Sequence, residues 1–317
     1  MDFYKIKKGL FISLIIGIIV FAGLSIYSDI NDLINVFVAF KYHYIPLILL
    51  LAPLNYFFRY IKWTYYLNLI NVKINKKDNL FIFLSGLCMT ITPGKLGELL
   101  KSYLLKEKAN VPISSTAPLV MGERLTDGIS MLILASIGSL AYNYGRKILI
   151  FVLLGMLLFI IVVQSPKIMY SVLRFLNRIP FLRRFGPAIK NFYDNAYIIL
   201  KLKPLLFAIS IGVVSWFFEG LVIYLTGKAL EANISLLASV FTVSFSSIVG
   251  AISMMPGGLF ATEGSIMGLL LMMGLNKDMA VATTIITRFS TLWLGVCIGL
   301  FGLAKTSRSI EKRYKMR

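Results

Sequence analysis

Six stretches of almost unbroken apolar sequence, separated by short polar segments, set the pattern of this chain. A helix needs about 20 mostly apolar residues to cross the hydrocarbon core of a bilayer. The six stretches have about that length, so the pattern predicts an all-α integral membrane protein with about six transmembrane helices. We place the predicted spans at residues 9–28, 45–66, 115–143, 147–166, 205–230 and 279–304.

Two further apolar regions, 80–105 and 236–274, are each interrupted in the middle. Proline and glycine break membrane helices, and the two pieces of the first region are together too short for two crossings. We therefore predict a re-entrant helical hairpin there. The second region fits either a re-entrant hairpin or two short crossings, and analogy with the first favours re-entry. The interrupting residues are Pro93-Gly94 and Pro256-Gly257-Gly258.

The two broken regions have matched surroundings, which indicates an internal repeat. Arg124 follows Pro93 by 31 residues, and Arg288 follows Pro256 by 32. Each half then contains three spans and one hairpin, and an odd number of crossings inverts the second half relative to the first. The predicted inverted repeats are residues 1–146 and 147–317.

The distribution of basic residues predicts the orientation. The chain has 33 Lys and Arg against 14 Asp and Glu. With the N-terminus in the cytoplasm and 80–105 re-entering, 25 bases lie in inner segments and 5 in outer ones, as the positive-inside rule requires. We therefore expect a multi-pass protein of the cell membrane with both termini in the cytoplasm. The basic linker 165–204 should form amphipathic helices on the cytoplasmic leaflet, and 29–44 a short surface helix on the other side.

The composition argues against other classes of protein. With 58% hydrophobic residues and a mean hydropathy of +0.80, the chain lies outside the range of soluble domains. Its net charge of +19 does not predict nucleic-acid binding, because the bases lie in loops between apolar spans. We find no Walker loop, G-x-S-x-G or H-E-x-x-H sequence, and His43 is the single histidine. We expect no enzyme activity, no cofactor and no metal site.

Charged residues inside the apolar regions are the candidates for chemistry. Charges at membrane depth are costly, so they should pair with one another or face water. Spacings of three and four residues place neighbouring charges on one helix face. These residues are either structural ion pairs that stabilise the hairpins or the lining of a polar substrate-binding cavity. The candidate binding residues are Lys95, Glu98, Glu123, Arg124, Asp127, Glu263 and Arg288.

Two more features add to this candidate site. Glu219 has no local partner in the sequence, so it is either a proton-titrating site or a residue close to the membrane surface. The helix that restarts after each Pro-Gly break has unpaired N–H groups and a positive dipole end. Glycine also lets a ligand approach the backbone closely. The breaks are therefore candidate anion-binding nests, at Pro93, Gly94, Pro256, Gly257 and Gly258.

The sequence resembles the lysylphosphatidylglycerol synthase transmembrane-domain family, whose members also form the membrane half of the multiple peptide resistance factor. The resemblance rests on Thr92–Glu98, Gly122–Asp127, Pro256–Leu259 with Glu263, and Thr287-Arg288. It implies a lipid-translocating membrane protein whose substrate is an anionic phospholipid or a polyprenyl-phosphate-linked lipid. The resistance factor carries a soluble aminoacyl-transfer domain after its spans, whereas this chain stops at Arg317, so we do not expect the synthase activity here. Other relatives occur near glycosyltransferases, which makes a lipid-modifying enzyme a candidate partner.

Three functions remain open at this point. The first is a flippase or scramblase that binds a lipid headgroup between the two hairpins. The second is a secondary transporter of a small anionic solute, and the third is a non-transporting subunit that positions a lipid-modifying enzyme. The sequence leaves the substrate, the coupling ion and the oligomeric state undetermined.

The charge count generates a prediction about topology. A cysteine introduced at Arg184 in the basic linker should react with a membrane-impermeant thiol reagent only from the cytoplasmic side, as should cysteines at either terminus. Labelling of residue 184 from the outside alone would contradict both this topology and the inverted repeat.

Overall fold

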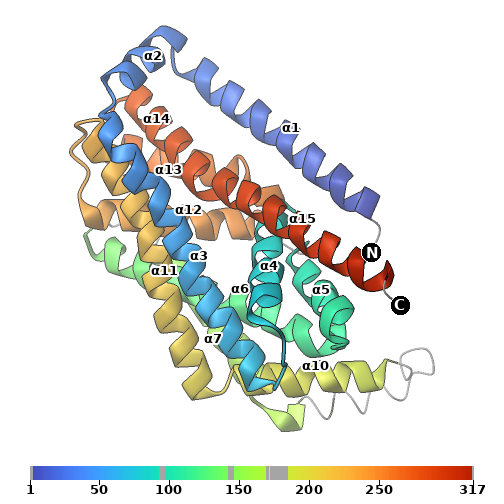
Figure 1. The fold of residues 1–317 in the computed structure, drawn as a ribbon. Coiled ribbons are helices and arrows are strands. Elements are labelled where there is room, and N and C mark those ends of the chain that lie inside the picture. Colours follow the sequence, from blue (N-terminus) through green and yellow to red (C-terminus); the bar gives the residue numbers. More distant parts are fainter. Residues whose placement is uncertain (1–2, 93–96, 142–145, 169–170, 172–184, 316–317) are drawn as a thin grey trace.

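The computed structural model describes residues 3–92, 97–141, 146–168, 171 and 185–315, and every regular element in these residues is a helix (Figure 1). The first half of the chain contains α1 (Phe3–Tyr27), α2 (Ile30–Ala39), α3 (Ile45–Leu69), α4 (Lys76–Leu87), α5 (Leu100–Ala109) and α6 (Ile113–Ala141). The second half contains α7 (Arg146–Val163), α10 (Gly186–Ile199), α11 (Leu202–Ala229), α12 (Leu236–Ile252), α13 (Ala261–Met272), α14 (Lys277–Arg288) and α15 (Leu294–Lys315). Short 3₁₀ turns lie at Tyr42–Tyr44, Cys88–Ile91 and Pro256–Gly258, and a π-helical turn at Phe289–Trp293 joins α14 to α15.

The six predicted apolar stretches coincide with α1, α3, α6, α7, α11 and the continuous helix α14–α15. Among the described residues, three helical segments are long and apolar enough to cross a membrane, namely Tyr42–Leu69, Leu202–Ala229 and Lys277–Glu311. Leu14–Tyr27 of α1 and Ile30–Ala39 of α2 are together long and apolar enough to form a fourth span, although the two helices are bent by 96°. The predicted class, an all-helical multi-pass membrane protein, is therefore confirmed.

Polar residues mark where several helices begin. The side-chain oxygens of Asp29, Asn75, Ser235 and Asn276 accept hydrogen bonds from backbone N–H groups in the first turns of α2, α4, α12 and α14. Such caps satisfy donors that lipid cannot satisfy. The short helix predicted within 29–44 is α2, and its start is defined by Asp29.

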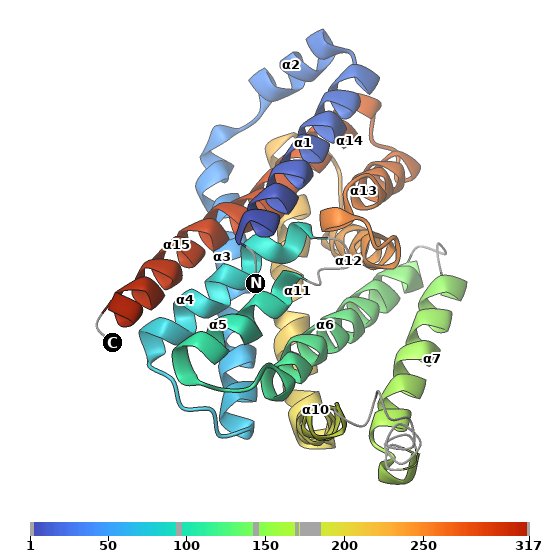
Figure 2. The same cartoon turned by 90° about the vertical axis from the view of Figure 1, so that its right-hand side faces the viewer.

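The first helix of each broken region packs on the opposite half of the chain. α4 lies along α15, and α12 lies along α6 (Figure 2). Glycines permit this close approach: a Cβ atom on Gly299 of α15 would lie 2.2 Å from the backbone nitrogen of Cys88, and one on Gly138 of α6 would lie 2.4 Å from Cβ of Phe241. Each half therefore supplies the surface on which the other half's broken region packs.

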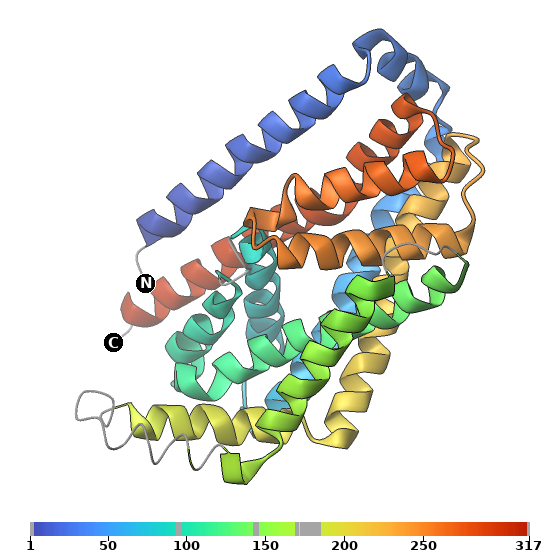
Figure 3. The same ribbon diagram turned by 180° about the vertical axis from the view of Figure 1, so that it is seen from behind.

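The molecule has two distinct ends. α2 lies at one end, whereas α10, the first turn of α1 and the last turn of α15 lie away from it (Figures 1 and 3). α10 is the described helical part of the predicted basic linker, and it runs across that end rather than along the bundle (Figure 3). A helix in this position is suited to the membrane surface.

The contact between α15 and α4 generates a prediction about stability. Gly299→Leu should lower the free energy of unfolding by about 1–3 kcal/mol, because the added side chain has no space beside Cys88. Gly155→Leu on α7 is the matched control, since nothing lies within 4 Å of a Cβ at that position. Thermal unfolding of both variants in detergent measures the difference, and equal stabilities would contradict the packing of α4 on α15.

Candidate functional site

A cluster of buried charges lies where α3, α5 and α6 meet, and Asp127 of α6 is at its centre. Lys62 of α3 donates a short hydrogen bond to Asp127 and a second one, of 3.3 Å, to the Thr126 hydroxyl. Arg124, one turn before Asp127, places Nη2 3.1 Å from its other carboxylate oxygen. Arg59 of α3 places Nε 3.8 Å from that same oxygen. One carboxylate thus holds three bases from two helices.

Two other carboxylates complete this group, which we call the Asp127 cluster. Glu98, just before α5, lies 3.2 Å from Arg124. Glu123 pairs with Lys101 of α5, whose ammonium lies 4.2 Å from the ring centre of Trp63. A cation over an indole face adds to the stabilisation that the carboxylate provides. The members of the cluster are Arg59, Lys62, Glu98, Lys101, Glu123, Arg124 and Asp127.

The positions of three bases correct the sequence interpretation. The 25 bases counted in the inner segments included Lys101 and, from the end of the second predicted span, Arg59 and Lys62. Arg59, Lys62 and Lys101 are 6%, 0% and 2% exposed and lie inside the protein. A signal was present in the sequence: Arg59 and Lys62 are three residues apart within a predicted span, so they share one helix face. That face of α3 is the one that meets α6. Without these three bases the inner segments still carry many more positive charges than the outer ones.

The second helix break forms a separate buried ion pair. Gly257 and Gly258 have φ values of +62° and +65°, which side chains rarely adopt, so the turn after Pro256 depends on glycine. Arg288, at the end of α14, donates to the Gly257 carbonyl at 2.7 Å and to Glu263 at 2.7 Å. Glu263 lies in the first turn of α13, where a negative charge is favoured by the helix dipole.

A small polar cavity lies between these two charged groups, and its volume is about 80 Å³. Arg59 reaches its wall from the Asp127 cluster, and Arg288 reaches it from the second break. Trp216 of α11 was not among the predicted site residues. It is 5% exposed, lines the cavity, and has an indole N–H without an acceptor among the described residues. The first broken region contributes Leu87 and Thr90 to the lining, and the second contributes Gly250, Gly257, Gly258 and Thr262. Glu219 and, from the π-helical turn, Thr291 and Leu292 complete this part of the wall.

The predicted site residues thus fall into two sets. Glu98 and Asp127 are both paired with Arg124, and Glu123 is paired with Lys101. Arg288 and Glu219 line the cavity, and Glu263 is paired with Arg288. Glu219 is partly buried and lies on the cavity wall. Lys95, Pro93 and Gly94 lie outside the described residues. The two broken regions do meet, because a Cβ on Gly257 would lie 3.4 Å from the Ile91 side chain, two residues before Pro93.

The fold and the buried charges define an integral membrane protein with a polar interior. A model of the lysylphosphatidylglycerol synthase TM region matches residues 14–299, and the chain belongs to that family. The suspected resemblance is therefore confirmed.

Three archaeal relatives are similar over most of their length. A UPF0104 membrane protein of Methanocaldococcus jannaschii is 27% identical over 229 residues, covering 71% of this chain and 97% of the relative. One from Methanothermobacter thermautotrophicus is 22% identical over 278 residues, covering 80% and 82%. One from Pyrococcus horikoshii is 22% identical over 317 residues, covering 91% and 95%. Their names describe membrane proteins and specify no substrate.

The Asp127 cluster generates a prediction about stability. Asp127→Ala removes the partner of three bases, and stranding buried charge should lower the free energy of unfolding by about 3–5 kcal/mol. The exposed pair Lys41–Glu231, 2.7 Å apart, offers the control. There the hydrogen bond and charge of Lys41 lower the pKa of Glu231, but solvent screens the pair, so Glu231→Ala should change stability little.

Unfolding of both variants in detergent tests this expectation. Asp127→Ala/Lys62→Met should recover part of the loss, because it removes one of the stranded charges. A stability of Asp127→Ala equal to that of Glu231→Ala would mean that the cluster is hydrated.

Proposed function

We propose that this protein moves an anionic lipid between the leaflets of the cell membrane, as a flippase or scramblase, and that the lipid headgroup binds in the polar cavity. The observation that carries the proposal is the cavity itself. Its wall brings two arginines and a glycine turn together inside a protein that spans a membrane. A polar cavity at the break of a membrane helix is a typical position for a substrate site.

The lining suits a phosphate group. Arg59 and Arg288 provide positive charge, and an arginine fork matches the oxygens of a phosphate. The indole N–H of Trp216 and Nε of Arg59 have no hydrogen-bond acceptor among the described residues, so an anionic oxygen would satisfy donors that are otherwise buried at a cost. Glu263 orients Arg288, and Glu98 and Asp127 orient Arg124, which holds these bases in place.

The size of the cavity limits what it holds in this conformation. A volume of about 80 Å³ accommodates about five to eight water molecules. That is enough for a phosphate group and too small for a phosphate-linked sugar, so a larger headgroup would require the two breaks to separate. Both predicted substrates, an anionic phospholipid and a polyprenyl-phosphate-linked lipid, present a phosphate. Their tails would stay in the bilayer.

The reciprocal packing of the two halves supports the mechanism. α4 rests on α15 and α12 rests on α6, which is the exchange expected of two inverted repeats with re-entrant hairpins. α4, α5, α12 and α13 have between 10 and 17 residues, less than the length of about 20 that a crossing needs. Movement of one hairpin against the other would open the cavity alternately. The N-terminus, the linker and the C-terminus would face the cytoplasm.

Glu219 is the proposed proton-binding residue. It shares the cavity wall with Arg59 and Arg288, so its charge would respond to an arriving anion. Without a nucleotide-binding sequence, transport would be passive or driven by an ion gradient. The cavity also has room for a free inorganic anion, which makes a small-anion transporter the second candidate.

Reconstitution in liposomes tests the proposal. With a fluorescent phosphatidic acid and a fluorescent polyprenyl phosphate as substrates, the unaltered protein should exchange label between leaflets. Arg288→Gln should abolish exchange by removing charge, and Gly257→Val should abolish it because a β-branched residue is strained at the φ of +62° that this turn requires. Trp216→Phe, which removes only the N–H donor and a little volume, should slow it.

Gly274→Val is the control for Gly257→Val, because Gly274 also has a positive φ, of +92°, lies outside the cavity, and has nothing within 4 Å of an added Cβ. It should exchange lipid as the unaltered protein does, and gel filtration and melting should show that each variant is folded. Uptake of inorganic phosphate without lipid exchange would favour the small-anion transporter. If the protein moves neither of the two lipids nor inorganic phosphate, the remaining candidate function is a non-transporting subunit that positions a lipid-modifying enzyme.

A further inference from the structure

The π-helical turn at Phe289–Trp293 separates the polar cavity from a second, larger hollow. Thr291 and Leu292 face the cavity, whereas Phe289 and Trp293 line a groove of about 520 Å³ between α3 and α14–α15. That volume lies in the range of small-molecule binding sites. π-helical turns are rare and often occur at functional sites, because the extra residue changes which side chains face each side.

The groove is apolar throughout the described lining. Its described walls carry no charged side chain, and both of its hydroxyl groups are occupied within the protein: that of Tyr42 donates to the Phe37 carbonyl at 2.8 Å, and that of Ser290 donates to the Ile286 carbonyl. The indole N–H of Trp293 is buried and has no acceptor among the described residues. A ligand in this groove would gain from burial of apolar surface and find few hydrogen-bonding partners. These walls suit a hydrocarbon chain.

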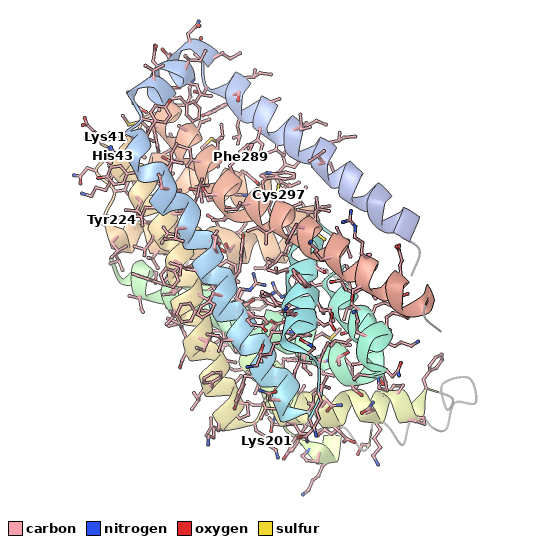
Figure 4. All side chains as sticks on the ribbon, in the orientation of Figure 1. Lys41, His43, Lys201, Tyr224, Phe289 and Cys297 are labelled. Carbon is pink, nitrogen blue, oxygen red and sulfur yellow. The ribbon has the colours of Figure 1, made fainter. Side chains whose placement is uncertain are left out.

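The length and position of the groove match one leaflet of a bilayer. From Ile285 to Cys297 the helix rises about 18 Å, close to the ~15 Å that each leaflet contributes to the hydrocarbon core. Figure 4 shows Phe289 and Cys297 along α14–α15, with Lys41 and His43 at the α2 end and Lys201 at the opposite end. The groove begins beside Tyr42, next to those polar residues, and extends towards the middle of the molecule.

α1 holds the aromatic wall of the groove in place. Phe21 of α1 stacks on Phe289 with ring centres 5.5 Å apart, and Gly17 lies so close to Trp293 that an added Cβ would be 2.1 Å from its ring. Phe289 on this wall is 58% exposed and Leu49 on the α3 wall is 43% exposed, so the groove is open to its surroundings. Those surroundings are lipid, since α3 and α14–α15 are apolar enough to span the membrane.

We propose that this groove binds one hydrocarbon chain of a membrane lipid, held longer than the lipids that merely surround the protein. The site is distinct from the polar cavity and does not depend on translocation. Its occupant is a lipid chain rather than a second protein copy, because the walls match one chain in length and lack the polar rim that protein interfaces carry.

Photo-crosslinking tests the site. The full-length protein is placed in lipid nanodiscs containing a phospholipid with a diazirine midway along one chain, and crosslinks are mapped by mass spectrometry. Groove residues should be labelled about tenfold more often than Leu154 and Leu158, exposed residues of α7, which is the ratio produced by about 1.4 kcal/mol of preferential binding. Equal labelling, or crosslinks between protein copies through the groove, would overturn the proposal.

Filling the groove provides the matched control. Leu49→Trp should reduce groove labelling to the level of α7, whereas Leu50→Trp, at the neighbouring exposed residue outside the lining, should leave it unchanged. On α15, Cys297→Trp fills the groove and Leu300→Trp, at an exposed residue outside the lining, is its control. Groove labelling of these two variants replaces the first comparison if Leu49→Trp fails to fold. Labelling that is insensitive to both Leu49→Trp and Cys297→Trp would also overturn it. Lipid exchange is measured separately, so an active protein with an unlabelled groove would count against this site alone.

Discussion

The requirement that charge inside a membrane protein be neutralised governs the interior of this molecule. Asp127 satisfies it for three bases at once, with Lys62, Arg124 and Arg59 arranged around one carboxylate. Each of these side chains would be costly to bury alone, and together they form a group whose members restrict one another's positions. The relative placement of α3 and α6 is therefore tied to one residue.

The same constraint distinguishes the Asp127 cluster, which stabilises the fold, from the polar cavity, which is proposed to bind a ligand. In the Asp127 cluster every acid is paired with at least one of the four bases, and this suits a structural role. The cavity is different because Arg288 meets Glu263 and a backbone carbonyl on one side and open space on the other. Arg59 belongs to both, and so it connects the part of the molecule that is fixed by charge pairing with the part proposed to receive a ligand.

The backbone imposes a second constraint that leads to the same location. A broken helix in a membrane exposes N–H and C=O groups that only protein or water can satisfy. Gly257 and Gly258 adopt positive φ values, and the Gly257 carbonyl is satisfied by Arg288. The 3₁₀ turn at Cys88–Ile91 ends against Gly257. The second break and the end of this 3₁₀ turn thus lie together beside a polar cavity, and the π-helical turn places apolar side chains on the other side.

The sequence by itself determined the helices and their class, because apolar length alone sets a span, and capping residues such as Asp29 and Asn276 set where helices begin. It also identified Glu98, Arg124, Asp127, Glu263 and Arg288, since a charge in an apolar region is visible without any fold. It could not identify Trp216, whose role depends on facing a cavity, nor the depth of Lys101, which depends on Trp63 and Glu123 from other helices. Pairing across helices is decided by packing, so only the tertiary structure showed that Lys62 and Arg59 meet Asp127. The reason is physical: a sequence records which groups must find partners in a membrane, and the fold decides which partners are within reach.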